Sequence, residues 1–479
     1  MPKHIEIQPN LSNFLSSFRE IGYKLETAVS DVIDNSISAK AQNIKISLLP
    51  SIKTLVIFDD GTGMDRDTLI EAMRMGTFKD FRQSGDLGKF GLGLKTASFS
   101  QTKKFSVVSK CNGIVSALQW DIDYMEENQA WYAKELTEAD VVPIIMQVDQ
   151  DVVQKMKDLP SWTVVIWENM DKYSEKHLEE LASSVRDHLA LVFHRYMSKE
   201  GYKGRKVKLT FNGTNIEPKD PFAVNFTATQ KNPTETILVR GHNVEITACD
   251  IPNHNKLTAK QYQDLDMGDG LTKNQGFYLY REGRLLCWGT WFGLAKSCDA
   301  TSLARIMIDT DNQQDELWNI DVKKSTAEPI PEVRDILRPY AEKVRKRSQT
   351  TKAHRAVKRG TGIDWWIEER RDEKTSFRIN RQHPIFLTIM KDSGELGHLI
   401  TEMFNEIEAN LPIKSIDAVM NQEPHSISQN TDIDRESITK TIKTLYALPT
   451  TKENILNMLV LYYGDHKEEL EKLINEVLS

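Results

Sequence analysis

Apolar residues in the first 170 positions follow two different periods. Between residues 24 and 39 they recur at the spacing of a helix, which predicts an amphipathic helix there. Residues 56–58 form a short unbroken apolar run, and residues 161–170 begin an alternating β-branched segment at Thr163; both patterns predict buried strands. Helices and strands therefore mix within one N-terminal domain.

The later pattern changes twice. Residues from roughly 200 to 330 alternate in the manner of strands, separated by Asn-Gly, Arg-Gly and Glu-Gly turns. The last hundred residues show helical spacing, with an apolar stripe on the final helix that is typical of a core or a dimer seam. We expect an α+β chain with domains at 1–195, 196–332 and 333–479, the last mainly helical.

Composition narrows the class of protein. The chain has 479 residues, 39% of them hydrophobic, which is enough for two or three domains. A formal net charge of −7 argues against a wholly basic nucleic-acid coat. The four cysteines form no CxxC pair and the eleven histidines show no zinc spacing. We expect a reduced cytoplasmic protein, with no bilayer-spanning run and no signal peptide.

Candidate chemistry begins where the apolar run 56–58 ends. Asp59 and Asp60 follow it directly and enter a turn that contains Gly61 and Gly63. A carboxylate beside a backbone that approaches a ligand closely suits recognition of a base or a metal. A purely structural turn is the alternative, because Asp-Gly after a strand is common.

The helix at 24–39 carries a second polar group. Asp31 and Asn35 are four residues apart and share one helical face, with Asp34 and Ser38 beside them. A carboxylate that polarises a water and a carboxamide oxygen that binds Mg²⁺ would divide two tasks. A solvated helix face is the alternative interpretation.

A third group lies in residues 84–100. Glycines at 85, 88, 91 and 93 precede a helix that is expected from Leu94, and Lys89 and Lys95 add positive charge. Glycine-rich backbone that opens onto a helix N-terminus suits phosphate binding. The spacing is neither that of a Walker loop nor that of a dinucleotide-binding loop that follows a strand.

Taken in order, these segments resemble the GHKL (Bergerat-fold) ATPase superfamily, which includes gyrase-type topoisomerases, MutL, the ninety-kilodalton heat-shock chaperones and MORC proteins. The resemblance implies that Asp59 accepts a hydrogen bond from adenine and that Asn35 binds Mg²⁺. It implies further ATP contacts by these residues: Gly61, Gly63, Met64, Gly88, Lys89, Phe90, Gly91, Leu92, Gly93, Lys95 and, through water, Thr163. Residues 1–195 would then be a Bergerat α/β sandwich, and the cofactors would be ATP and Mg²⁺.

One position departs from the family pattern. The usual general base is Glu, and Asp31 occupies that position with a side chain one methylene shorter. General-base catalysis contributes roughly 10²- to 10⁴-fold and requires hydrogen-bond reach to the attacking water. We therefore expect slow ATP hydrolysis with Asp31 as the base, and Asp34 is the rival.

The resemblance extends past the first domain. GHKL proteins commonly carry a βαβ transducer whose lysine reaches the γ-phosphate; Lys324 is the first candidate here and Lys323 the second, with a charged loop as the alternative. The segment YLYREGRLL at 278–286 and the N-terminal segment 18–36 look closest to the MORC-like branch, including its prokaryotic members.

The C-terminal region offers a charge pattern instead of a motif. From Lys343 to Arg359 there are eight Lys or Arg and no Asp or Glu. Such a run can contact phosphates of DNA or RNA, but a solvated helix or a linker is the favoured interpretation. Two functions remain open: an ATP-gated homodimeric clamp on DNA, in a bacterial genome-defence or antiviral role, and a chaperone-like or signalling switch with a protein client.

Overall fold

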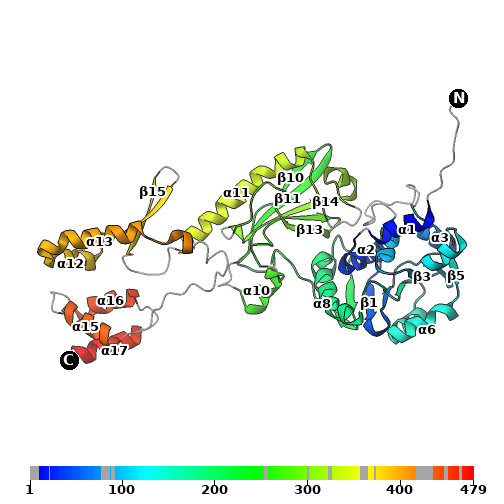
Figure 1. The fold of residues 1–479 in the computed structure, drawn as a ribbon, viewed down its shortest axis with the longest axis horizontal. Helices are drawn as coiled ribbons and strands as arrows, with labels where there is room; N and C mark the ends of the chain where they lie inside the picture. Colours follow the sequence, from blue (N-terminus) through cyan, green and yellow to red (C-terminus); the bar gives the residue numbers. More distant parts are fainter. Residues whose placement is uncertain are drawn as a thin grey trace. The chain divides into compact units, whose positions relative to one another are not determined.

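The computed structural model describes residues 10–20, 22–76, 87, 92–252, 257–268, 270–298, 301–321, 326–356, 365–371, 374–416, 435–446, 451–462 and 467–478. They divide into two compact units, 1–349 and 350–479 (Figure 1). In this part of the chain no helix is long and apolar enough to cross a membrane.

The first unit begins with a sheet in which, among the described residues, eight strands lie in the order β5-β4-β3-β6-β2-β1-β7-β8. Neighbouring strands run antiparallel except β1 and β7, which are parallel. The strands are β1 (Asn43–Leu49), β2 (Thr54–Asp59), β3 (Lys104–Cys111), β4 (Ile114–Asp121), β5 (Lys134–Leu136), β6 (Trp162–Glu168), β7 (Lys208–Phe211) and β8 (Thr214–Asn215).

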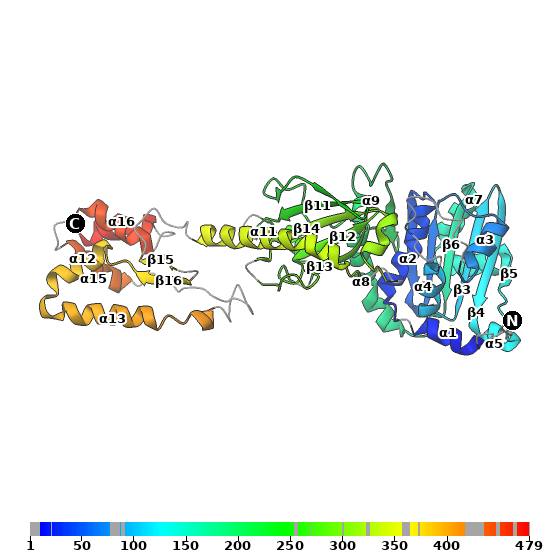
Figure 2. The same cartoon turned by 90° about the horizontal axis from the view of Figure 1, so that it is seen from above.

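Helices cover both faces of this sheet. They are α1 (Leu11–Arg19), α2 (Leu25–Ser38), α3 (Arg66–Met73), α4 (Gly93–Gln101), α5 (Ile122–Asn128), α6 (Glu138–Val148), α7 (Gln150–Asp158), α8 (Glu175–Val192) and α9 (His194–Met197), with a 3₁₀ turn η1 at Pro50–Ile52. Side chains of α2, α4 and α8 pack with Ile57 and Val165 on one face, whereas α6 and α7 pack with Phe58 and Val164 on the other. Figure 2 shows α2 and α4 lying together along the sheet. Because each face is covered, β2 is buried along its whole length, as its unbroken apolar run predicts.

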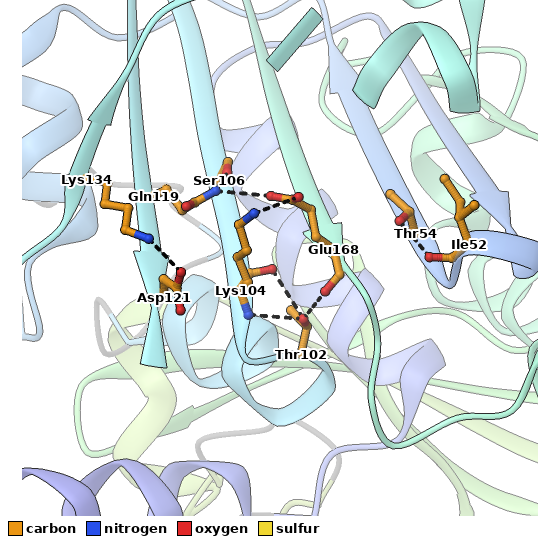
Figure 3. A network of polar contacts seen from close by, with 9 residues as sticks. All are labelled: Ile52, Thr54, Thr102, Lys104, Ser106, Gln119, Asp121, Lys134 and Glu168. Atoms are coloured by element: carbon orange, nitrogen blue, oxygen red, sulfur yellow. Dashed lines mark hydrogen bonds and ion pairs between the residues drawn. The ribbon is translucent and has the colours of Figure 1, made fainter. Parts of the chain in front are cut away.

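A polar network ties β3, β4 and β6 together at one end (Figure 3). The carboxylate of Glu168 accepts hydrogen bonds from Lys104 Nζ and from Gln119 Nε2, each at 3.1 Å. Gln119 also donates to Ser106 Oγ at 2.9 Å, and Thr102 donates to the Glu168 carbonyl. Thr102, Ser106 and Gln119 are buried and find partners within the network, so it is structural and lies apart from the candidate site.

A second sheet in the same unit has the order β10-β11-β14-β12-β13, and β9 pairs with β11. Its elements are β9 (Gln230–Lys231), β10 (Glu235–Val239), β11 (His242–Asp250), α10 (Ala259–Asp266), β12 (Gly276–Arg281), β13 (Arg284–Thr290), β14 (Ala304–Thr310) and the 3₁₀ helix η5 (Asn312–Leu317). Val333, Leu337 and Ala341 of α11 (Pro331–Ala356) pack into its core. Together the strands and α11 make a mixed α/β layer that follows the first sheet.

The second unit is mainly helical. It contains the hairpin β15 (Trp366–Arg371) and β16 (Lys374–Ile379), then α12 (Pro384–Asp392), η6 (Gly394–Leu396), α13 (Gly397–Ala409), α15 (Arg435–Tyr446), α16 (Lys452–Tyr462) and α17 (Lys467–Val477). Leu470, Leu473 and Ile474 of the predicted stripe are buried against α15 and α16, so this stripe is part of a core.

The predicted class is confirmed: the chain mixes α and β, with an N-terminal sheet domain and a helical C-terminal region. The division at 195 and 332 stays a prediction. Two facts bear on where these limits lie: β7 and β8, after residue 195, pair with the first sheet, and α11 is continuous from residue 331 to residue 356.

Candidate functional site

Three polar side chains line up across adjacent strands on the face that α2 covers. The register pairs Asp59 of β2 with Thr163 of β6, and Thr163 with Ser109 of β3. Ser109 Oγ lies 2.9 Å from Thr163 Oγ1. The face of the sheet under α2, which is otherwise lined by apolar side chains, therefore presents a short polar row at one end.

Asp59 is the acidic end of this row and is held firmly. Ser36 Oγ of α2 donates to its Oδ2 at 2.7 Å, and the Gly61 amide donates to its Oδ1 at 3.0 Å. Burial raises the pKa of the Asp59 carboxyl from 3.8 to about 6, although both donors act to lower it. Each oxygen keeps a second acceptor position for a ligand donor.

The glycine turn after Asp59 brings the backbone close to the row. A Cβ on Gly61 would lie 2.8 Å from the Ala39 carbonyl oxygen, and one on Gly63 would lie 2.0 Å from the Lys110 carbonyl oxygen. Gly63 also has φ +67°, in the left-handed region. The Met64 amide then donates to Ser109 Oγ at 2.8 Å, which closes the turn onto the row.

Asp60 has a different role from Asp59. Its carboxylate accepts hydrogen bonds from the Gln42 and Asn43 amides at 2.7 and 2.8 Å, and from Asn43 Nδ2 at 2.7 Å. These bonds fix the start of β1. The two adjacent carboxylates therefore have different roles: Asp59 belongs to the polar row, and Asp60 anchors the start of β1.

Helix α2 turns two carboxylates inward and one carboxamide outward. The Asp31 and Asp34 side chains have no exposed surface, whereas Asn35 is exposed. Tyr23 donates its hydroxyl hydrogen to Asp31 Oδ2 at 3.0 Å. A Cβ on Gly93, the first residue of α4, would lie 3.9 Å from that same oxygen. The structure therefore brings Asp31 next to the start of α4.

A residue that the sequence did not single out completes this cluster. Arg284, the first residue of β13, lies with its Nε 2.9 Å from Asp34 Oδ1 and its Nη2 3.4 Å from Asp31 Oδ1. Arg284 lies in the segment 278–286, which the sequence singled out only for its resemblance to a family and not for a contact with α2. Nothing in a linear pattern joins positions 253 residues apart.

The start of α4 offers amide donors, since no side chain of the described residues caps it at Leu92. Lys95 points elsewhere: its Nζ donates to the Ala72 carbonyl at the end of α3, at 2.9 Å. Burial lowers the pKa of the Lys95 ammonium to about 8, and Glu71 opposes this. The predicted contacts of Gly88, Lys89, Phe90 and Gly91 lie outside the described residues.

The structure says less about the proposed Mg²⁺ ligand and about the lysine proposed to contact the γ-phosphate. Lys323 and Lys324 lie outside the described residues. Within the described ranges, no cluster of three or more His, Cys, Asp or Glu side chains is suited to a metal ion. Asn35 is placed one helical turn beyond Asp31, with its amide toward solvent. A cation here would need oxygen ligands from outside the protein, as Mg²⁺ receives from phosphates.

A separate hollow of about 670 Å³ lies beside this cluster. Lys24, His188, Arg284 and Trp288 are part of its wall, whereas Asp59 and Thr163 are not. Burial and nearby Arg284 lower the pKa of His188 to about 3. We place the site at the polar row because its donors and acceptors converge there.

Known proteins are similar to the part of the chain that carries some of these groups. Residues 23–153 match the family described as histidine kinase-, DNA gyrase B- and HSP90-like ATPase. Over 108 residues the chain is 31% identical to ATPase morc-1 of Caenorhabditis elegans. This alignment covers 22% of the chain and only 12% of that relative. The family match includes Asp31, Asp59 and Lys95 and ends before Thr163 and Arg284.

Proposed function

We propose that this chain binds Mg-ATP and hydrolyses it slowly as a nucleotide-gated switch. The proposal starts from residues 23–153, which match a GHKL-type ATPase family, and from the similarity to a MORC ATPase. The observation that carries the proposal is the row Asp59–Thr163–Ser109, closed by the two-glycine turn. A buried acceptor beside a close-packed backbone suits a flat base with an exocyclic amino group.

Adenine recognition is assigned to this row. The free acceptor position of Asp59 would receive the adenine amino hydrogen, and Thr163 would contribute through a water. Met64, half-buried beside the turn, would pack on the base. Gly61 and Gly63 pack directly against the Ala39 and Lys110 carbonyls, so a side chain at either position would displace the turn that holds Asp59 for the base.

Hydrolysis is assigned to Asp31. Its carboxylate lies beside the start of α4, where the amide donors of Leu92 and Gly93 would face phosphate. Asp34 is the rival base, but its carboxylate pairs with Arg284 at 2.9 Å. Asn35 would bind Mg²⁺ together with phosphate oxygens. A phosphate contact by Lys95 requires its ammonium to leave the Ala72 carbonyl.

The test compares the two acidic residues. We expect Asp31→Ala to lower phosphate release by at least about 10²-fold, the lower limit of general-base contributions, while ATP-analogue affinity persists. Asp34→Ala, judged by the same two measurements, should keep more turnover. Unchanged turnover in Asp31→Ala, with loss in Asp34→Ala, would transfer the base to Asp34.

The gating step follows the behaviour of a two-state switch. Nucleotide favours a closed dimer only by its differential affinity for that state. We propose that ATP holds two chains together as a homodimer and that hydrolysis releases them. Lys324, or Lys323, is the proposed contact between the second sheet domain and the γ-phosphate.

DNA is the proposed client. The basis is the run of Lys and Arg residues in the C-terminal part of α11. The helix includes the part of this run from Lys343 to Ala356. Charge reversal of Arg345, Lys346 and Arg347 should weaken DNA binding and flatten its dependence on salt, measured with and without a non-hydrolysable ATP analogue. A protein client, in a chaperone-like or signalling role, is the alternative; salt-insensitive behaviour in the wild type would favour it.

A further inference from the structure

The β12–β13 hairpin, Tyr280 to Leu285, is buried where the second sheet meets the first domain. Its turn residues Glu282 and Gly283 have φ of 48° and 81°. A Cβ on Gly283 would lie 2.5 Å from the ring of Tyr202, so the turn lies directly on that ring. Lys203 Nζ pairs with the Glu282 carboxylate at 3.1 Å. The hairpin is therefore held in one place against the first domain.

Two arginines flank this turn, and each reaches a segment of the candidate ATP site. Arg281 is oriented by Asp315, with Nε to Oδ1 at 2.6 Å, and its Nη1 donates to the Leu87 carbonyl at 2.9 Å. The Leu87 amide in turn donates to Ser38 Oγ, at the end of α2, at 3.2 Å. Arg284 reaches the middle of α2. The same turn thus contacts α2 directly and through Leu87.

The contact of Arg284 with α2 is electrostatically strong. The Arg284 side chain is 3% exposed, and those of Asp31 and Asp34 are 0% exposed. Two buried carboxylates on adjacent turns repel each other and require a countercharge. The planar guanidinium reaches both at once, which the single ammonium of a lysine does not reproduce. Arg284 therefore acts on one oxygen of the Asp31 carboxylate while the Tyr23 hydroxyl holds the other, and together they set where this carboxylate points.

We propose that Arg284 is a positioning residue for hydrolysis, through which the second sheet domain holds Asp31 in its working orientation. The inference rests on the proposed function of Asp31 as general base. Arg284 acts through Asp31 and makes no contact with nucleotide. ATP would therefore bind normally without it, and the chemical step would slow.

The same interface supplies a matched control. Arg195 of α9 pairs with Asp309 of β14 and stacks its guanidinium 3.5 Å from the Tyr280 ring centroid. This pair also joins the first domain to the second sheet, but it does not touch Asp31. Loss of Arg195 tests the cost of weakening the interface alone.

The experiment measures single-turnover hydrolysis, ATP-analogue affinity and the urea midpoint for wild type, Arg284→Gln, Arg284→Lys and Arg195→Gln. We expect Arg284→Gln to lower the hydrolysis rate by about 10- to 100-fold, part of the general-base contribution, with analogue affinity within about threefold of wild type. Arg284→Lys should recover part of the rate. Arg195→Gln should lose stability while its rate stays near that of wild type.

The outcomes separate cleanly. Equal rates in Arg284→Gln and Arg195→Gln would overturn the inference and leave the proposed function standing. A loss of analogue affinity as large as the loss of rate would also overturn it, since Arg284 would then contact nucleotide. If Arg284→Gln does not fold, a rate in Arg284→Lys equal to that of wild type would overturn it. Absence of turnover in the wild type would overturn the proposed function, and this inference with it.

Discussion

Replacing Asp59 by Asn should move nucleotide affinity and folding stability in opposite directions. The substitution keeps the size of the side chain and removes its charge. Asp59 is buried, with 5% of its surface exposed, and its carboxyl has a pKa of about 6 in place of 3.8. Burial therefore makes the charged carboxylate costly in the folded protein, although it is still the main form at neutral pH, and a hydrogen-bond donor from a ligand would stabilise it.

The stability term follows from that pKa. A rise of roughly two in pKa, at about 1.4 kcal/mol per pKa unit, lowers the unfolding free energy by about 3 kcal/mol. This loss of stability is fully present above pH 6 and disappears as the pH falls toward 4. Asn removes this cost. An amide cannot accept from both Ser36 and the Gly61 amide as well as a carboxylate does, which offsets about 1 kcal/mol. The expected gain in unfolding free energy is about 2 kcal/mol at pH 7.5.

The affinity term has the opposite sign. A hydrogen bond from the adenine amino group to a charged acceptor contributes about 1.5–3 kcal/mol. Its loss should weaken ATP-analogue binding by about 10- to 150-fold. Urea unfolding and titration calorimetry on the same preparations measure the two terms.

Asp60→Asn is the matched control. Asp60 accepts hydrogen bonds from Asn43 and the Gln42 amide at the start of β1, so its loss should lower stability and leave nucleotide affinity within about threefold. Full ATP affinity in Asp59→Asn would refute the assignment of Asp59 to adenine. A large loss of stability in Asp59→Asn would refute the reasoning from burial.

Two further predictions concern the same site. Gly63→Ala should lose ATP-analogue binding, and its unfolding free energy should fall by more than the roughly 1–2 kcal/mol of left-handed backbone, because its Cβ would meet the Lys110 carbonyl. The control Gly113→Ala, at φ +80° with no atom within 4 Å, should lose only that backbone cost in the same urea titration. Affinity for adenosine should fall as the pH drops through about 6, where the Asp59 carboxylate becomes protonated, and Asp59→Asn should flatten that dependence in calorimetry; a pH-independent wild type would contradict it.

Much of this site could be predicted from the sequence because each of its parts lies within a short segment. A strand that ends in Asp59, a helix that carries Asp31 and Asn35, and a strand that begins near Thr163 can each be predicted from short windows. Their meeting depends on register: Asp59 lies opposite Thr163 only because β2 and β6 pair antiparallel at that offset. The sequence suggested the participants, and the pairing of the strands set the geometry.

Other features depend on long-range packing that no window contains. Arg284 reaches Asp31 and Asp34 only because the second sheet packs against α2. Lys95 was expected at phosphate, whereas its buried ammonium binds the Ala72 carbonyl. Such partners follow from which helix ends and strand turns meet.

Solution mass shows directly whether nucleotide controls the association of two chains. The mass of the wild-type chain would be measured with and without a non-hydrolysable ATP analogue and Mg²⁺, beside that of Asn35→Ala, whose exposed amide lies outside the core. We expect the analogue to shift the wild type from monomer to dimer and to leave the mass of Asn35→Ala unchanged. A wild type that stays monomeric under every condition would contradict it.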